Sequence, residues 1–443
     1  MKNIKLGKLW DSLHSSYWFV PTLMAGMAIA LAFTMLSLDR AGKSGSIEKL
    51  SWIYTGGPDG ARTMLSTIAG SMITVAGTAF SITIVALTLA SSQFGPRLLR
   101  NFMQDTGNQV VLGTFIATFI YCLLVLRTVR GDNYNVFVPQ ISVTVAIVLA
   151  LASIGVLIYF IHHASTTIQA SHVIGEVGSD LDKATNRLFP QKMGQNLPET
   201  RRRWVEEIPV GFDKEAAPVL ATQSGYIQAI DDEKLMKVAK SKDLLMRLKL
   251  RPGKFVVQGS ELLMVWPGER VNEKLTQQIN NVFILGKERT DQQDIEFCIN
   301  ELVEVALRAI SPGINDPFTA IQCIDQLSAG LCRLAERDFP SPYRYDDDNN
   351  LRVIADPVTF ARLTDDAFNQ IRQYSKSDVA VRIRMLEAIA VIATHTHKKK
   401  DRTALLRHAQ VLQDSSREEV SQECDRACIE EQYLAAVKAL EQR

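Results

Sequence analysis

The chain has 443 residues, of which 47% are hydrophobic and 22% charged, with a formal net charge of +1. This balanced charge argues against a nucleic-acid partner, and six scattered cysteines without a CxxC pair or a Cys/His cluster argue against a metal site. These averages would suit a soluble protein, but the distribution along the chain does not. Charged residues are nearly absent from four long windows before His162 and are dense after it.

The four apolar windows are each near or above the length of a membrane span. A helix needs about 17–20 residues to cross a hydrocarbon core about 30 Å thick. We therefore expect transmembrane helices at about 17–38, 64–92, 110–126 and 141–162. The first window is too long for the apolar region of a signal peptide, and three further spans follow it. Residues 1–163 are thus expected to form a four-helix domain within the lipid bilayer.

The distribution of basic residues predicts the orientation of these spans. Lys2, Lys5 and Lys8 precede the first span, and Arg97 and Arg100 lie between the second and the third. Basic residues are enriched on the cytoplasmic side of a membrane. Four crossings then place both termini in the cytoplasm. Arg127 and Arg130 follow the third span, on the side expected to be external, and do not fit this rule.

The second span differs from the others because hydroxyl side chains line one of its faces. Their spacing alternates between three and four residues, which places them on one side of a helix. Val85 is the one apolar residue at this spacing, and Gly70 and Gly77 lie beside the hydroxyl residues. The hydroxyl residues, here named the hydroxyl stripe, are Thr67, Ser71, Thr74, Thr78, Ser81, Thr88 and Ser92.

Two interpretations of the hydroxyl stripe remain open. Small and hydroxyl residues can form a tight seam between helices, and Ser and Thr can bond back to carbonyls of their own helix. Alternatively, the stripe lines a hydrated path at the centre of a homo-oligomer, where hydroxyls replace part of the water around an ion or small solute. Arg97 and Arg100 would then lie at the inner mouth of the pore, although anchoring to anionic headgroups also accounts for them.

The four apolar cores, the last of which ends at Ile161, contain no Asp, Glu, Lys, Arg or His. Proton pumps and voltage sensors usually place such a residue within a span. The composition of the spans therefore argues against both of these classes.

Beyond the spans the pattern changes twice. Residues 164–218 are expected to form a helical extension, which ends at Pro190, and then a linker. Residues 219–268 follow a strand-like pattern with turns at 251–254 and 258–260. This rhythm resembles the barrel-sandwich hybrid of biotinyl- and lipoyl-type domains. The segment has no lysine at an acceptor hairpin, so we expect a small β module without a cofactor.

Residues 269–443 are expected to be helical to the end of the chain. A helix at about 294–310 ends at the loop 311–317, and the next helix begins at Pro317. Asn315 and Asp316 are polar groups between two packed helices, which makes this loop a candidate binding site. The same residue types favour a plain joint between helices, with Asp316 as the N-cap of the second. The expected fold is thus an α-helical membrane domain followed by a cytoplasmic α+β domain.

Two stretches of the chain carry a family resemblance. They are TVAGTAFSITIVALTLASSQFGPRLLRNFMQD, which is followed by LGTFIATFIYCLLVL, and ALRAISPGINDPFTAIQCID. Over almost its whole length the chain resembles DUF2254, a family of predicted bacterial membrane proteins of unknown function. The resemblance implies four helices and a cytoplasmic domain in a bacterial inner membrane. It implies no activity, so no functional residue is carried over.

Among classes of function, an enzyme has the least support, because the chain contains no nucleophile elbow, P-loop, HExxH motif or Rossmann glycine pattern. The hydroxyl stripe and the uncharged spans favour an oligomeric channel-like or passive transport protein with a cytoplasmic regulatory domain. The alternative is a membrane-anchored sensor or scaffold, whose cytoplasmic region of about 280 residues binds a partner or a small ligand.

Overall fold

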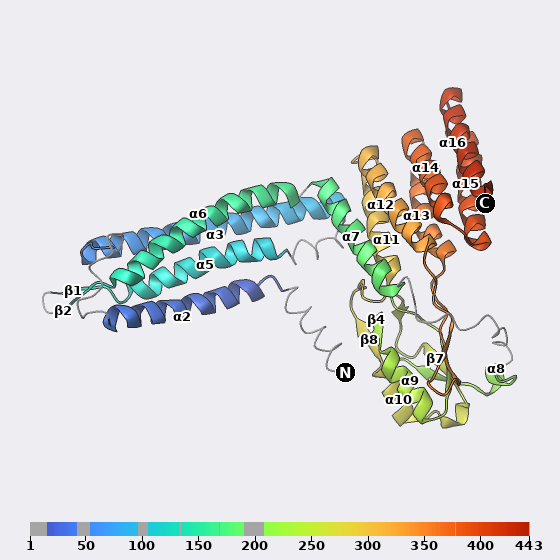
Figure 1. The fold of residues 1–443 in the computed structure, drawn as a ribbon, viewed down its shortest axis with the longest axis horizontal. Coiled ribbons are helices and arrows are strands. Elements are labelled where there is room, and N and C mark those ends of the chain that lie inside the picture. The colour runs from blue at the N-terminus through green and yellow to red at the C-terminus, as the bar shows by residue number, and fades with distance from the viewer. Residues whose placement is uncertain are drawn as a thin grey trace. The chain divides into compact units, whose positions relative to one another are not determined.

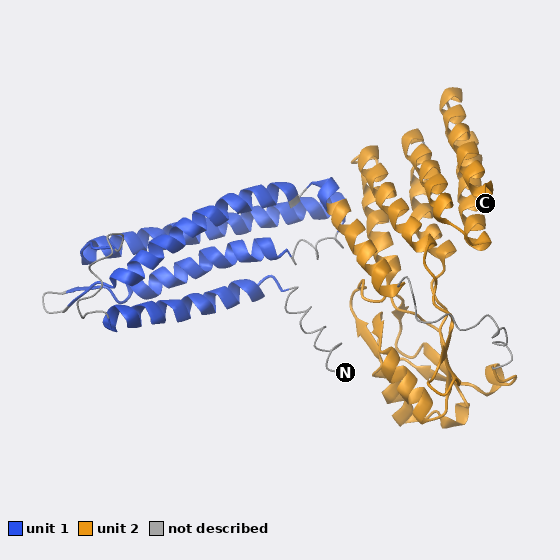
Figure 2. Cartoon of the chain, viewed as in Figure 1, with its two compact units in different colours: residues 1–172 blue, residues 173–443 orange. Residues whose placement is uncertain are grey.

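The chain divides into two compact units, residues 1–172 and residues 173–443 (Figure 2). The computed structural model describes residues 16–41, 54–95, 105–132, 135–167, 169–189, 208–376 and 378–442. Each unit has its own apolar core, which lies among helices in the first unit and around strands in the second.

Four long helices form the first unit: α2 (Phe19–Ala41), α3 (Pro58–Phe94), α5 (Thr106–Leu126) and α6 (Gln140–Thr167) (Figure 1). Among the described residues, these four are long and apolar enough to cross a membrane, which confirms the predicted spans. Helix α5 packs against all of the other three. Helix α3 has 37 residues and is therefore about 55 Å long, well beyond a hydrocarbon core of about 30 Å.

Small side chains allow α2 and α3 to approach α5 closely. Ala32 of α2 and Ala61 and Ala69 of α3 are buried in the same core as Tyr121 of α5. Small residues at such contacts permit the close backbone packing by which helices associate in lipid. The Tyr121 hydroxyl donates to the carbonyl oxygen of Ser142 at 3.0 Å, so its polar atom is satisfied within the bundle.

The end of α2 and the start of α6 meet through Asp39. Its carboxylate accepts hydrogen bonds from the backbone N–H groups of Ile141 and Ser142, both at 2.9 Å, and from the Ser142 hydroxyl at 2.5 Å. The first N–H groups of a helix have no partner within that helix, so Asp39 supplies the cap of α6. The antiparallel strands β1 (Arg130–Asp132) and β2 (Asn135–Phe137) connect α5 to α6.

The strands of the second unit form two sheets. The three-stranded sheet has the antiparallel order β6–β4–β8, made of Phe255–Val256, Gly225–Ile230 and Phe283–Gly286. The five-stranded sheet has the order β3–β7–β5–β10–β9, in which only β10 and β5 pair in parallel among these described strands. Its strands are, in that order, Ala217–Leu220, Glu261–Trp266, Leu245–Leu248, Leu351–Ile354 and Tyr343–Tyr345.

Short helices complete this β region. Helices α9 (Asp232–Ser241) and α10 (Glu273–Asn280) bury Leu235 and Leu275 in a core that they share with both sheets. The region also contains α8 (Phe212–Glu215) and the 3-10 helix η2 (Gly268–Arg270). Burial of leucine side chains from one face of each helix accounts for the apolar spacing in these otherwise polar segments.

The expectation that residues 269–443 are wholly helical is wrong for three strands, β8, β9 and β10. Each is only three or four residues long. In the parallel pair, Val353 of β10 lies opposite Met246 of β5, which is distant in the sequence. Because such pairing is non-local, the periodicity of a short apolar run does not reveal it. The β region is accordingly larger than the module expected at residues 219–268.

Six helices described in the second unit form three consecutive pairs: α11 (Ile295–Ala309) and α12 (Pro317–Ala335), α13 (Phe360–Tyr374) and α14 (Val379–His395), and α15 (Lys399–Glu419) and α16 (Glu423–Glu441). Strands β9 and β10 lie between the first pair and the second in the chain. Helices α11, α13 and α15 contact one another in turn, as do α12, α14 and α16, so the pairs stack in two rows (Figure 1).

Helix α7 (Ala170–Leu188) packs on α12 within the second unit. Gly330 of α12 leaves room for Leu181 of α7, since a Cβ at Gly330 would lie 2.4 Å from a Leu181 methyl group. Arg337 also donates to the side-chain oxygen of Asn186 at 2.7 Å. The fourth span was expected to continue into this segment as one helix. Instead α6 ends at Thr167, and α7 begins as a separate helix at Ala170 and packs on the stacked pairs.

Candidate functional site

The hydroxyl stripe lies on the face of α3 that points away from its own subunit. All seven hydroxyl residues and Val85 are exposed in the first unit. The buried face of α3 is formed by Ala61, Leu65, Ala69 and Ala76, which pack toward the other helices. At 3.6 residues per turn these two sets lie on opposite sides of the helix. Among the described residues of the first unit, the stripe therefore does not belong to the buried face of α3.

Most hydroxyls of the stripe donate hydrogen bonds to carbonyl oxygens of α3 itself, one turn earlier. Thr74 donates to Gly70 at 2.9 Å, and Thr78 donates to Thr74 at 3.0 Å. The same local bond is made by Thr67, Ser81, Thr88 and Ser92. Such bonds satisfy the O–H donor without a second helix, while each hydroxyl oxygen keeps capacity to accept. The stripe is thus compatible with an apolar environment and still presents acceptors.

Gly70 and Gly77, beside the stripe, face open space. Apart from the neighbouring backbone of α3, a Cβ at either position would have no heavy atom of the described structure within 4 Å. The packing of the subunit therefore does not require glycine here, although glycine lowers helix stability by about 1 kcal/mol relative to alanine. Arg97 and Arg100, the predicted inner-mouth residues, lie outside the described residues.

The loop 311–317 is a well-formed joint between α11 and α12. Asn315 has a φ of 53°, a left-handed conformation that asparagine tolerates better than most residues. The Asp316 carboxylate accepts from the backbone N–H of Thr319 at 3.2 Å and from its hydroxyl at 2.6 Å, so Asp316 is the N-cap of α12. These contacts account for both polar residues as parts of the joint, without a ligand.

A charged cluster surrounds Glu296 at the start of α11 and was not predicted from the sequence. The Glu296 side chain is only 4% exposed, yet it is paired with three cations. Lys254 approaches it at 2.9 Å and Arg362 at 2.7 Å, and Arg251 also donates to it. Burial opposes ionisation of Glu296, but the three cations outweigh burial and lower its pKa to about 2.

No local sequence signal would have found this cluster. Arg251 and Lys254 come from the turn between β5 and β6, and Arg362 comes from the first turn of α13. The one hint is Glu296 itself, a carboxylate that neighbours the buried residue Ile295 at the start of an amphipathic helix. A buried carboxylate requires partners, but their identity depends on the tertiary fold.

The Glu296 cluster borders a cavity of about 780 Å³ that lies wholly within the second unit. Its walls come from the end of α7, the start of α9, the β5–β6 turn, the start of α11 and the segment that leads into α13. Ligand-binding cavities in proteins typically have volumes of about 300–1,000 Å³. This cavity is therefore large enough to hold a small organic molecule.

Four spanning helices and a second unit of strands and stacked helices define an α-helical integral membrane protein with a large α+β unit. The chain belongs to the DUF2254 family of predicted membrane proteins, whose family model matches residues 14–391. The resemblance noted in the sequence is thus confirmed.

Mycobacteria contain relatives of this chain. An uncharacterized protein of Mycobacterium bovis is 34% identical over 427 residues, which cover 95% of this chain and 80% of that protein. An uncharacterized protein of Mycobacterium tuberculosis has the same identity and coverage. No solved structure shows a significant match to this chain.

Proposed function

We propose that this protein forms a homo-oligomeric channel-like or passive transport assembly in the bacterial inner membrane. Its hydroxyl stripe lies at the contacts between subunits and lines a path for an ion or small solute. The observation that carries the proposal is the exposure of the whole stripe on the side of α3 opposite its buried face. The second unit and both termini are cytoplasmic in this arrangement, by the basic residues before the first span. We assign the protein no catalytic step.

The contrast with α6 supports a subunit contact at α3. The outward residues of α6 include Leu151, Ile154 and Ile158, which are 64%, 52% and 66% exposed and have the large aliphatic side chains typical of a lipid-facing helix. The outward side of α3 also exposes aliphatic residues, but it differs from α6 in the seven hydroxyl residues of the stripe, beside which Gly70 and Gly77 are open. In lipid, helices associate through such small-residue faces, and a second copy of this chain is the partner that carries the same face.

A pore at this contact requires several subunits around an axis, because four helices are too few to enclose a hydrated path alone. The stripe extends from Thr67 to Ser92, about 37 Å along the helix, so it covers a hydrocarbon core of about 30 Å. Hydroxyl oxygens that accept hydrogen bonds along this length would replace part of the water around a solute.

The test is an ion-flux measurement on the full chain in liposomes. Thr74→Leu combined with Thr78→Leu places two bulky apolar side chains on the stripe, and it should reduce flux at least about tenfold relative to wild type, by analogy with dewetted apolar constrictions. The matched control is Thr34→Leu on α2, an exposed threonine that makes the same local bond, to Ala30 at 2.8 Å. This control should conduct as wild type does.

Two outcomes would reject the channel. One is an absence of flux through the wild type, and the other is equal flux through wild type and the double variant. A stable monomer in mild detergent would also count against an oligomeric pore.

The cavity of the second unit supports an alternative function, that of a membrane-anchored sensor whose α+β unit binds a small ligand. A sensor needs no flux and no particular oligomer. A protein that binds a ligand in the cavity but conducts nothing would therefore favour the sensor over the channel.

A further inference from the structure

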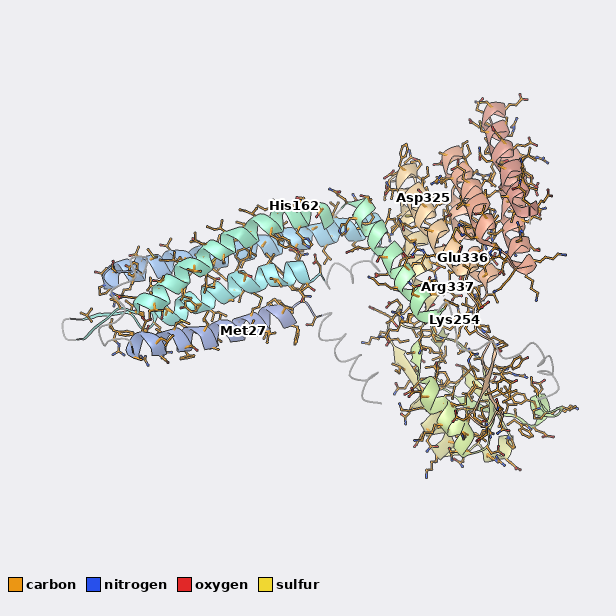
Figure 3. The ribbon with its side chains drawn as sticks, in the orientation of Figure 1. Met27, His162, Lys254, Asp325, Glu336 and Arg337 are labelled. Atoms are coloured by element: carbon orange, nitrogen blue, oxygen red, sulfur yellow. The ribbon has the colours of Figure 1, made fainter. Side chains whose placement is uncertain are left out.

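The cavity beside Glu296 lies where the strands of the second unit meet its helices, as the position of Lys254 shows (Figure 3). All of its lining residues belong to residues 173–443, so a ligand there would be bound by one unit of one subunit. Its occupancy is independent of whether the membrane helices form a pore.

Cations outnumber carboxylates in the walls of the cavity. Its carboxylates are Asp232, Asp294, Glu296 and Asp356. One of these, Asp294, is already neutralised by Arg289, whose Nη2 lies 2.7 Å from its Oδ2. The cations are Arg187, Lys249, Arg251, Lys254, Arg344 and Arg362. Arg187 and Lys249 are paired with Asp291 and Glu261 outside the lining, which leaves four cations against three carboxylates. The lining therefore carries a surplus of positive charge, which favours an anionic ligand.

The Glu296 cluster has unused hydrogen-bonding capacity for a second anion. A guanidinium has five N–H donors, and the contacts described for Arg251 and Arg362 with Glu296 each use one of them. The side chains of Arg251, Lys254 and Arg362 are 23%, 33% and 51% exposed, whereas Glu296 is almost fully covered. Glu296 thus holds three cations together, and their remaining donors match the oxygens of a phosphate group.

The rest of the cavity suits an apolar ring that carries polar substituents. Leu235, Met236 and Leu248 contribute apolar wall. Asp232 and Asp356 contribute carboxylates that would repel a purely anionic chain but can accept hydrogen bonds from amino or hydroxyl groups. A ligand that matches all three features has a phosphate, a ring and hydrogen-bond donors.

We propose that this cavity binds a soluble organic phosphate of about nucleotide size, with its phosphate on Arg251, Lys254 and Arg362 and its ring against the leucine and methionine wall. The site gives the second unit a ligand-binding role whether the membrane unit conducts or not.

The test is isothermal titration calorimetry on the full chain in nanodiscs of phosphatidylcholine, a lipid without net charge. The probes are adenosine 5′-monophosphate, adenosine and glycerol 3-phosphate. We expect adenosine 5′-monophosphate to bind more tightly than either of the other two, since adenosine lacks the phosphate and glycerol 3-phosphate lacks the ring. Arg362→Gln should weaken its binding by about tenfold or more, because a hydrogen bond to a charged group contributes about 1.5–3 kcal/mol.

Arg384→Gln is the matched control. Arg384 lies outside the cavity lining, pairs with Asp325 at 2.5 Å and has a partly exposed side chain, as Arg362 does. This control should bind as wild type does. If Arg362→Gln fails to fold, Lys254→Gln replaces it, because Lys254 is also assigned to the phosphate and its removal leaves Glu296 with Arg251 and Arg362 as partners.

The proposal would be overturned by no binding of adenosine 5′-monophosphate to wild type, by equal binding by wild type and the cavity variant, or by equal affinity for adenosine. Glycerol 3-phosphate binding as tightly as the nucleotide would also overturn it, and would point instead to a lipid headgroup.

Discussion

The carboxylate of Asp105 lies 2.5 Å from Nε2 of His163, and this contact joins the start of α5 to the last part of α6. The same carboxylate accepts from the backbone N–H of Gly107 at 2.8 Å and from the side-chain amide of Asn108 at 3.0 Å, so Asp105 is also the N-cap of α5. Tyr159 stacks on the His163 ring with centroids 5.3 Å apart. One side chain therefore fixes the end of a helix and ties it to its neighbour.

Two substitutions of Asp105 should separate these roles. Asparagine caps helices about as well as aspartate does, so Asp105→Asn should lose only the charged contact with His163. Asp105→Ala should lose the cap as well, and should be less stable than Asp105→Asn by about 1 kcal/mol. Thermal unfolding of the full chain in nanodiscs measures the difference. The control is Asp59→Asn. The Asp59 carboxylate is 98% exposed and lies 3.7 Å from Arg62, so loss of this contact should change the unfolding temperature little. Equal losses from both Asp105 variants would show that capping contributes nothing here.

A leucine at Gly77 should disrupt association between subunits without disturbing the subunit itself. Outside the neighbouring backbone of α3, a Cβ at Gly77 would have no atom of the described structure within 4 Å, so the subunit should accommodate the new side chain. At a contact between copies, it would separate two closely packed helices and weaken association at least about tenfold, or about 1.4 kcal/mol. Energy transfer between labelled subunits in liposomes measures the association.

Gly155→Leu on α6 is the matched control for Gly77→Leu, because a Cβ at Gly155 also has no neighbour within 4 Å. Its helix has large aliphatic residues on its outward face and should remain in lipid. Weaker association of the Gly155 variant, with Gly77→Leu unaffected, would move the subunit contact from α3 to α6.

The sequence predicts the four spans well because a membrane span is a local property: about 20 apolar residues define it regardless of the rest of the fold. The hydroxyl stripe is likewise read from spacing along one helix, and its side chains do share one exposed face. The partners of Glu296 could not be predicted, since Arg251 and Arg362 meet it through the arrangement of β5, β6 and α13. Strand β10 was missed for the same reason, because its partner β5 lies far away in the chain.

Asp366 should limit the stability of the second unit at neutral pH. Burial, and then the negative charge of Glu296, raise the pKa of Asp366 to about 6 from an ordinary value near 3.8, although Arg362 and Lys254 oppose the shift. A raised pKa in the folded state means that folding favours the protonated form. The resulting stability is present below about pH 4 and is lost as the pH rises through 6.

Asp366→Asn keeps the side chain neutral at every pH. It should therefore stabilise the protein by about 1–2 kcal/mol at pH 7.5, and the gain should vanish near pH 4. Thermal unfolding at both pH values measures the effect. The neighbouring variant Asp365→Asn should instead destabilise, because Asp365 accepts from His408 at 2.8 Å and from Arg407. A gain from Asp366→Asn that persisted unchanged at pH 4 would exclude ionisation as its cause.

Removal of Glu419 should open the pair α14 and α15 locally. Arg382 of α14 is fully buried, and its guanidinium donates to the carbonyl oxygen of Ser375 at 3.1 Å, to the Ser415 hydroxyl at 3.0 Å and to Glu419. Glu419→Ala leaves this buried cation without its carboxylate, which should cost about 3 kcal/mol, at the low end for broken buried pairs because Glu419 is partly exposed. Hydrogen exchange of α14 amides should therefore accelerate about a hundredfold.

The control is Asp325→Ala. It breaks the partly exposed pair between Asp325 of α12 and Arg384, which lies on α14 as Arg382 does, and it should change the exchange of α14 amides by less than about tenfold. Similar acceleration by both variants would mean that burial of the Arg382 guanidinium does not determine the local stability of α14.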